Sequence, residues 1–79
     1  MGTRERRLTF KEKQELAALP ETIERLEREI GELHQAMSAP EFYKRPGAEI
    51  ARESTRLRQL DEELAAAYQR WEALEDRAG

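Results

Sequence analysis

Two stretches of the chain carry apolar residues at alternating steps of three and four. The first stretch consists of Leu16, Leu19, Ile23, Leu26, Ile30, Leu33 and Met37. The second stretch starts after Pro46 and Gly47 and departs from this spacing only at Glu53. Its apolar members are Ile50, Leu57, Leu60, Leu64, Ala67, Trp71, Leu74 and Ala78. Such spacing places apolar side chains at the a and d positions of a heptad repeat, so the sequence predicts two helices with one apolar seam each.

The start of the first helix is marked by Thr9 and Glu12, which have the spacing of a capping box. The apolar pattern then extends this helix over residues 10–37. Pro20 lies inside that range, where a proline removes a backbone donor and clashes with the preceding turn. Because the apolar spacing continues across Pro20, we expect a kink or a restart at this point.

Residues 38–47 contain Pro40, Pro46 and Gly47 and cannot continue either helix as regular structure. We therefore expect a tip that reverses the direction of the chain. Loop closure over about ten residues favours pairing of the two seams within one chain. The alternative, pairing between two chains, remains open from the heptads alone.

Within this tip, Ser38 and Glu41 repeat the capping-box spacing. The repeat predicts a short helical turn over residues 40–44. We expect this turn to fold Phe42 or Tyr43 back over the end of the seam.

The predicted fold class is all-α, an antiparallel two-helix coiled-coil hairpin that exists as a monomer. A flexible basic arm would cover residues 1–9, and the hairpin would cover residues 10–79. Its two arms would span residues 10–37 and 48–78 on either side of the tip.

Residues that face each other in an antiparallel hairpin have numbers that add to a constant, here about 87. This register places Leu16 opposite Trp71. It also sets Leu33 against Glu53 or Ser54, which predicts one weak layer near the tip.

Composition limits what else the chain can be. The 79 residues are 39% charged and 38% hydrophobic, with a mean hydropathy of -0.95, which is too polar for a sizeable globular core. Disorder would also fit this composition, but the regular apolar spacing argues against it. With no cysteine there is no disulfide, no thiolate nucleophile and no cysteine zinc site. Since no apolar run approaches about 20 residues, we expect no membrane contact and a cytoplasmic location.

Side chains with catalytic or metal-binding chemistry are present but lack the setting that such chemistry needs. His34 has no second histidine or cysteine with which to bind a metal. Acidic residues that could look like paired catalytic carboxylates are Glu24 with Glu27, and the run Asp61, Glu62 and Glu63. A two-helix hairpin offers no cleft to shift their pKa values, so we expect a solvated face, no enzyme activity and no cofactor within these residues.

Trp71 and Tyr68 could form a stacking platform for nucleic-acid bases. Trp71, however, occupies an a position on the seam, which favours core packing. Tyr68 lies one position off the seam and is the less certain of the two.

Charge is unevenly distributed along the chain. Residues 1–19 and 38–58 each hold five basic and three acidic residues, although the whole chain has a net charge of -3. The candidate nucleic-acid-binding residues are Lys44, Arg45, Arg52, Arg56, Arg58, Arg4, Arg6, Arg7, Lys11 and Lys13. Basic patches suit phosphate backbones, whereas the alternative is that these charges only confer solubility and helical ion pairs.

Several segments resemble a known family in their order and spacing. The segments are Arg7-Leu8-Thr9-Phe10-Lys11-Glu12, Glu15-Leu16, Leu19-Pro20, Ile23-Glu24, Leu26-Glu27, Ala39-Pro40-Glu41-Phe42-Tyr43 and Arg70-Trp71-Glu72-Ala73-Leu74-Glu75. Together they resemble the C-terminal domain of Uup-type ABC-F ATPases over nearly the whole chain. The resemblance implies a DNA-binding tail that follows two ATP-binding cassettes in a soluble, non-transporting ATPase associated with nucleic acid and the ribosome.

The implied partners are therefore DNA or ribosomal RNA, and the parent ATPase cassettes in cis. ATP would bind to the parent, outside these residues. Because the chain is net acidic, any nucleic-acid contact is expected at the two basic patches only. The alternative function is a structural spacer or a protein- or ribosome-interaction hairpin that binds no nucleic acid.

Overall fold

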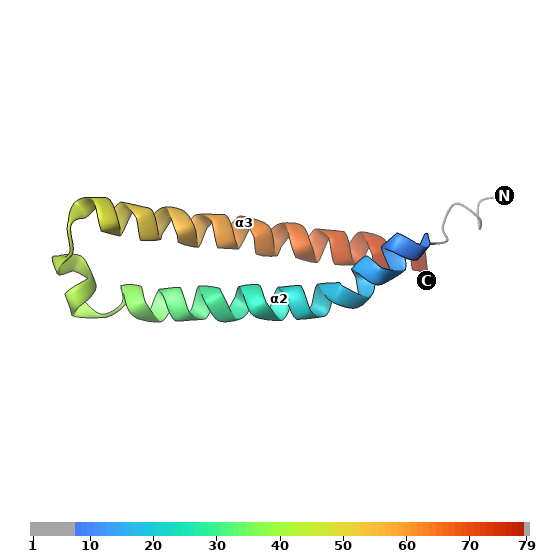
Figure 1. The fold of residues 1–79 in the computed structure, drawn as a ribbon, viewed down its shortest axis with the longest axis horizontal. Coiled ribbons are helices and arrows are strands. Elements are labelled where there is room, and N and C mark those ends of the chain that lie inside the picture. The colour runs from blue at the N-terminus through green and yellow to red at the C-terminus, as the bar shows by residue number, and fades with distance from the viewer. Residues whose placement is uncertain (1–7, 79) are drawn as a thin grey trace.

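The computed structural model describes residues 8–78, and these residues contain two long α-helices, one short 3-10 helix and no strand. Helix α2 spans Phe10–Met37, the 3-10 helix η1 spans Pro40–Lys44, and helix α3 spans Gly47–Ala78 (Figure 1). These bounds agree with the predicted arms to within one residue. The predicted flexibility of the basic arm falls largely on residues 1–7, which lie outside the described residues.

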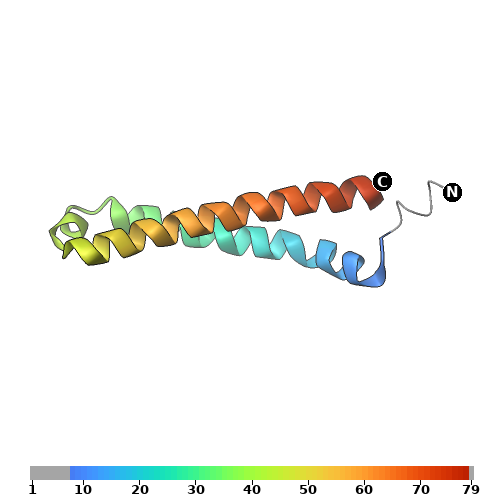
Figure 2. The same ribbon diagram turned by 90° about the horizontal axis from the view of Figure 1, so that it is seen from above.

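The two α-helices lie alongside each other and run in opposite directions (Figures 1 and 2). The molecule measures 61 × 17 × 16 Å. We call the end formed by residues 38–47 the tip, and the end where α2 begins and α3 finishes the root. The antiparallel hairpin is thus confirmed.

Among residues 8–78, neither long helix has a stretch that is apolar over a length sufficient to span a membrane.

The predicted capping box begins α2. The Glu12 backbone N–H donates to the Thr9 hydroxyl oxygen at 3.1 Å, and the Thr9 backbone N–H donates to the Glu12 carboxylate at 2.9 Å. Two backbone donors that have no partner within the helix are thereby satisfied. This local pairing fixes where α2 starts.

Helix α2 continues through Pro20 without a break. Its ribbon changes direction in the blue-to-cyan part, which the colour bar assigns to roughly the first third of the helix (Figure 1). A proline inside a helix produces such a bend because its ring crowds the preceding turn. The alternative of a restart at Pro20 is therefore wrong, and the bend of the ribbon agrees with the expected kink.

The core is a single stripe between α2 and α3. Its buried members are Leu19, Ile23, Leu26, Leu60, Ala67 and Leu74. Partly buried residues packed against them are Leu8, Leu16, Ile30, Leu33, Leu64 and Trp71. All but Leu8 were predicted on the seams. Burial of these apolar surfaces is the main favourable term for a pair of helices that are otherwise exposed.

The end of the second seam was predicted wrongly. Ala78 is exposed, although the heptad spacing placed it on the seam. The register sets Ala78 opposite Thr9, which precedes the first residue of α2. At this point α2 has no apolar side chain to cover the alanine.

Most polar contacts between the helices lie close to the predicted register. Glu15 pairs with Arg70 and Glu29 pairs with Arg56, and the residue numbers of both pairs add to 85. Those of Glu12 and Arg77 add to 89, whereas those of Glu27 and Tyr68 add to 95. Leu33 and Glu53 line one shallow depression between α2 and α3. This depression is where the weak layer was expected.

Candidate nucleic-acid interface

The tip begins where Ser38 ends α2. The Ser38 backbone N–H donates to the carbonyl oxygen of His34 at 3.0 Å, and its hydroxyl donates to the carbonyl oxygen of Gln35 at 2.8 Å. The hydroxyl therefore points back to α2, and η1 starts after Ala39 without a side-chain cap. The predicted turn over residues 40–44 is confirmed, but the proposed cap between Ser38 and Glu41 is wrong.

Two adjacent aromatic residues of η1 take opposite roles. Phe42 is buried, with 2% of its surface exposed, whereas Tyr43 is 66% exposed. Their ring centroids lie 5.2 Å apart at an interplanar angle of 89°, an edge-to-face contact. Phe42 is therefore the residue that folds back onto the hairpin, and Tyr43 faces solvent.

Basic residues follow this aromatic pair in the sequence. Lys44 and Arg45 follow Tyr43 directly, and Arg52 and Arg58 extend from the first turns of α3. We call these four residues the tip patch. All four are exposed, and within residues 8–78 none of them forms an ion pair with a carboxylate. The Arg45 guanidinium lies 5.6 Å from the centroid of the Phe42 ring, a cation–π contact that holds it near η1.

Arg56 differs from the other predicted residues at the tip. Its guanidinium forms an ion pair with Glu29 of α2 at 3.0 Å, and 49% of its side chain is exposed. Part of its charge is therefore compensated within the hairpin. With 3.6 residues per turn, Arg52 and Arg58 project from different sides of α3. The four residues of the tip patch therefore do not form one straight row.

The second predicted basic patch lies at the root. Lys11 and Lys13 are exposed on the first turn of α2 and form no ion pair among the described residues. Arg4, Arg6 and Arg7 lie outside the described residues. The structure therefore shows only the two lysines of this patch.

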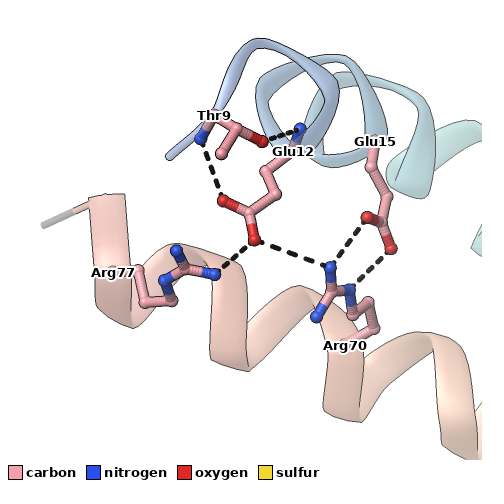
Figure 3. Close-up of polar contacts among 5 residues, drawn as sticks. All are labelled: Thr9, Glu12, Glu15, Arg70 and Arg77. Atoms are coloured by element: carbon pink, nitrogen blue, oxygen red, sulfur yellow. Dashed lines mark hydrogen bonds and ion pairs between the residues drawn. The ribbon is translucent and has the colours of Figure 1, made fainter. Parts of the chain in front are cut away.

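A cluster of charged residues joins the two helices at the root (Figure 3). The Arg70 guanidinium binds the Glu15 carboxylate through two contacts of 2.6 and 3.0 Å. Arg77 donates to Glu12, and Arg70 lies 4.0 Å from the same carboxylate. With Thr9, these four residues form what we call the root cluster. This cluster is not among the features predicted from the sequence, although the register that pairs Glu15 with Arg70 could have indicated it.

These contacts shift the ionisation of the two glutamates. The Thr9 backbone N–H and then the Arg77 guanidinium lower the pKa of Glu12. The Arg70 guanidinium lowers the pKa of Glu15, and Glu15 in turn raises the pKa of Arg70. Both carboxylates are thus held in the charged form by hydrogen bonds and ion pairs. Their role in this arrangement is structural.

The other aromatic candidates do not form a base-stacking platform. Trp71 is partly buried against the apolar core, as its seam position predicted. The Tyr68 hydroxyl donates to Glu27 at 2.7 Å, and this carboxylate raises the pKa of Tyr68. The two rings are tilted by 44° with centroids 6.4 Å apart. A carboxylate at the edge of this pair disfavours an approaching phosphate.

The residues with potential metal chemistry remain apart from one another. His34 is exposed, in agreement with the surface role expected for it. Among residues 8–78, no group of three or more histidine, cysteine or acidic side chains is arranged to hold a metal ion. The strongest concentration of chemically related groups is therefore the basic tip.

Comparison with known proteins identifies the family. Residues 7–76 match the family described as the ABC transporter C-terminal domain. The chain belongs to this family. Two proteins of Haemophilus influenzae, the ATP-binding protein Uup-like and the ATP-binding protein Uup, are each 32% identical to it over 71 residues. The resemblance to the C-terminal domain of Uup-type ABC ATPases is confirmed, and no solved structure matches the chain.

The chain corresponds to a small part of these relatives. The match covers 90% of this chain but only 16% of the Uup-like protein and 11% of Uup. The ATP binding stated in their names therefore belongs to proteins far longer than this ABC transporter C-terminal domain.

Features that carried the resemblance have distinct structural roles in this ABC transporter C-terminal domain. Pro20 lies within helix α2, which bends in its first third. Phe42 anchors the 3-10 helix at the tip, Arg70 belongs to the root cluster, and Trp71 packs against the core. The characteristic positions of the sequence thus shape the two ends of the hairpin.

Proposed function

We propose that this domain is a nucleic-acid-binding tail that contacts the phosphate backbone of DNA through the tip patch. The observation that carries the proposal is four exposed cations at one end of the molecule, none paired with a carboxylate among the described residues. Charge-assisted contacts to phosphate need such uncompensated lysines and arginines.

The charge of the remaining hairpin supports binding at the tip. Residues 38–58 carry a net charge of +2, whereas residues 20–37 and 59–79 carry -3 and -4. The acidic arms repel a polyanion, so an approaching DNA molecule is oriented toward the tip. Binding through phosphates carries no direct sequence information, which implies weak binding without sequence preference.

The family suggests where this activity operates. The matched relatives are named ATP-binding proteins, and we propose that this domain serves as the C-terminal tail of such a protein in the cytoplasm. ATP would then bind outside these 79 residues, and the hairpin would place nucleic acid next to the parent ATPase. Catalysis would belong to the parent alone.

Binding of a labelled DNA duplex at several salt concentrations tests the proposal. If about three phosphates are neutralised, log K falls against log salt with a slope of about -2.7, and the dissociation constant lies at about 10 to 100 µM. Replacing Arg52 and Arg58 by Gln should make the slope shallower by up to about 1.8, because two of the four cations are removed. Helicity should persist because Gln is a good helix former and neither residue lies on the seam.

A matched variant removes the same charge from another exposed helical surface. Arg25 and Arg28 of α2 form ion pairs with glutamates one turn away, and their replacement by Gln should leave the slope near that of the wild type. An unchanged slope in the Arg52 and Arg58 variant would exclude this part of the tip as the binding surface. Absence of wild-type binding at low salt would favour the alternative function, a structural spacer or a protein- or ribosome-interaction hairpin. Preference for ribosomal RNA over the duplex would change the partner but not the surface.

A further inference from the structure

An exposed aromatic side chain, that of Tyr43, directly precedes two residues of the tip patch in the sequence. Tyr43 is 66% exposed, and Lys44 and Arg45 follow it in the sequence. Phosphate binding by itself requires only the cations. The tyrosine therefore adds a second kind of chemistry to this surface.

The Tyr43 ring contacts the ring of a buried residue, Phe42. Its neighbour Phe42 makes an edge-to-face contact with it at 5.2 Å and is itself 2% exposed. The backbone of η1 is fixed by two hydrogen bonds, from Phe42 N–H to the Ala39 carbonyl oxygen at 3.0 Å and from Arg45 N–H to the Phe42 carbonyl oxygen at 3.2 Å. The exposed ring thus belongs to an ordered 3-10 helix, and the two residues that follow it in the sequence are cations.

An exposed aromatic ring next to cations fits an unpaired nucleobase. Every base has a π-face that can stack on such a ring, while neighbouring lysine and arginine side chains contact the phosphates on either side. In an intact duplex the faces of the bases are stacked on one another and are accessible only at the ends. Duplex DNA therefore uses the cations of the tip but leaves the tyrosine unused.

We propose that Tyr43 is a stacking site for an unpaired base, so that the tip binds DNA with single-stranded segments through one more contact than it makes with a blunt duplex. This inference rests on the proposed function, because it requires the tip patch to bind nucleic acid. The residues that carry it are Tyr43 for the base and Lys44 and Arg45 for the adjoining phosphates.

The other strongly exposed aromatic residue provides a stringent comparison. Phe10 is 74% exposed and is followed by Lys11, but it lies at the root, at the opposite end of the hairpin from the tip patch. Phe10 should therefore contribute little to binding of a single strand.

The test measures binding of the 79-residue chain to a fluorescein-labelled single strand and to a blunt duplex of the same length, by fluorescence anisotropy at low salt. Tyr43→Ala should weaken binding of the single strand about fivefold or more and leave binding of the duplex within about twofold. Tyr43→Phe keeps the ring and should bind both as the wild type does. Phe10→Ala should also resemble the wild type.

Each contrary result has a separate meaning. If the wild type binds the duplex with the expected salt dependence but Tyr43→Ala binds the single strand normally, the stacking site is wrong and the proposed function stands. Equal weakening of both ligands by Tyr43→Ala, or an equal effect of Phe10→Ala on the single strand, would also overturn the stacking site. If the wild type binds neither ligand, both the stacking site and the proposed function are wrong.

Discussion

Glu12 links the two helices at the root through a single carboxylate. It accepts from the Thr9 backbone N–H as part of the helix cap, and it also accepts from Arg77 at the other end of the sequence (Figure 3). Only 18% of its side chain is exposed. The local cap and the tertiary contact therefore depend on the same charged group.

The lowered pKa of Glu12 gives stability a defined pH dependence. A carboxyl whose pKa is lower in the folded than in the unfolded chain contributes stability above its unfolded pKa, about 4.3, and loses it as the pH falls through the folded value. Glu12→Gln cannot titrate. We expect the thermal midpoint of the wild type to exceed that of Glu12→Gln near neutral pH and to approach it at about pH 3 or below.

A control variant separates the ion pair from the cap. In a background with Arg70→Gln and Arg77→Gln, the Glu12→Gln replacement should produce a smaller change with pH, because part of the cause of the lowered pKa is gone. A difference between wild type and Glu12→Gln that stays constant from neutral to acid pH would show that Glu12 does not make these contacts in solution.

The sequence could predict half of this residue's role. Thr9 and Glu12 are three positions apart, and the reach of a capping box is short and local. The bond to Arg77 spans 65 positions and depends on register, helix bending and rotamers. The register could indicate that Glu12 and Arg77 lie close together, but it does not determine which of the exposed charged side chains form a bond.

Among the elements, η1 determines how the hairpin closes. It is five residues long and too short to be stable alone, since isolated 3-10 turns bury little and bond poorly. Its buried side chain, Phe42, provides the apolar contact that holds it. The packing of η1 against the rest of the hairpin thus depends on one ring.

Two neighbouring substitutions should distinguish this role. Phe42→Ala should lower the free energy of unfolding by about 3 to 5 kcal/mol, the range typical of a buried phenylalanine. Tyr43→Ala should change it by about 0.5 kcal/mol or less, since its ring is largely exposed. Urea denaturation followed by circular dichroism measures both.

The comparison is decisive because the two residues are adjacent and similar in size. Equal losses of stability in Phe42→Ala and Tyr43→Ala would mean that the tip packs differently in solution. A stable Tyr43→Ala protein is also what makes this variant suitable for the binding experiment.

The long helices were far easier to predict than the tip. A seam repeats over many turns, so one exception such as Glu53 leaves the period intact, and the bounds of α2 and α3 follow. The tip offered no repeat. Phe42 and Tyr43 were indistinguishable in sequence, and Ser38 had the spacing of a cap but bonds to the preceding turn instead.

The whole molecule is held together by contacts between two segments of one chain. Its core is a single stripe with no buried polar or charged side chain among the described residues. Small domains of this kind have little stability to spare. Because the tip connects the two helices in one chain, the effective concentration of one helix near the other is fixed by the length of this connection. Their pairing is then independent of the protein concentration.

We therefore expect a monomer whose thermal midpoint is unchanged over about a hundredfold range of protein concentration. Sedimentation at the same concentrations should give a single species with the mass of one chain. In a sample in which every chain is isotopically labelled, nuclear Overhauser contacts should be observed between Leu16 and Trp71.

Mixing labelled and unlabelled chains provides the control. Isotope-filtered spectra should show no contact between the two kinds of chain. Contacts between them, or a midpoint that rises with concentration, would show that the seams pair in a dimer and that closure within one chain is wrong.

The hairpin is attached to whatever precedes or follows it at the root alone, because α2 begins and α3 finishes at that end (Figure 1). The distance from the root to the tip is close to the 61 Å length of the molecule. A small rotation at the root becomes a large sweep of the tip, and a force applied to the tip returns to the root as a torque. If the tip binds nucleic acid as proposed, the two paired helices would transmit the force of that contact to the root, without any rearrangement within either helix.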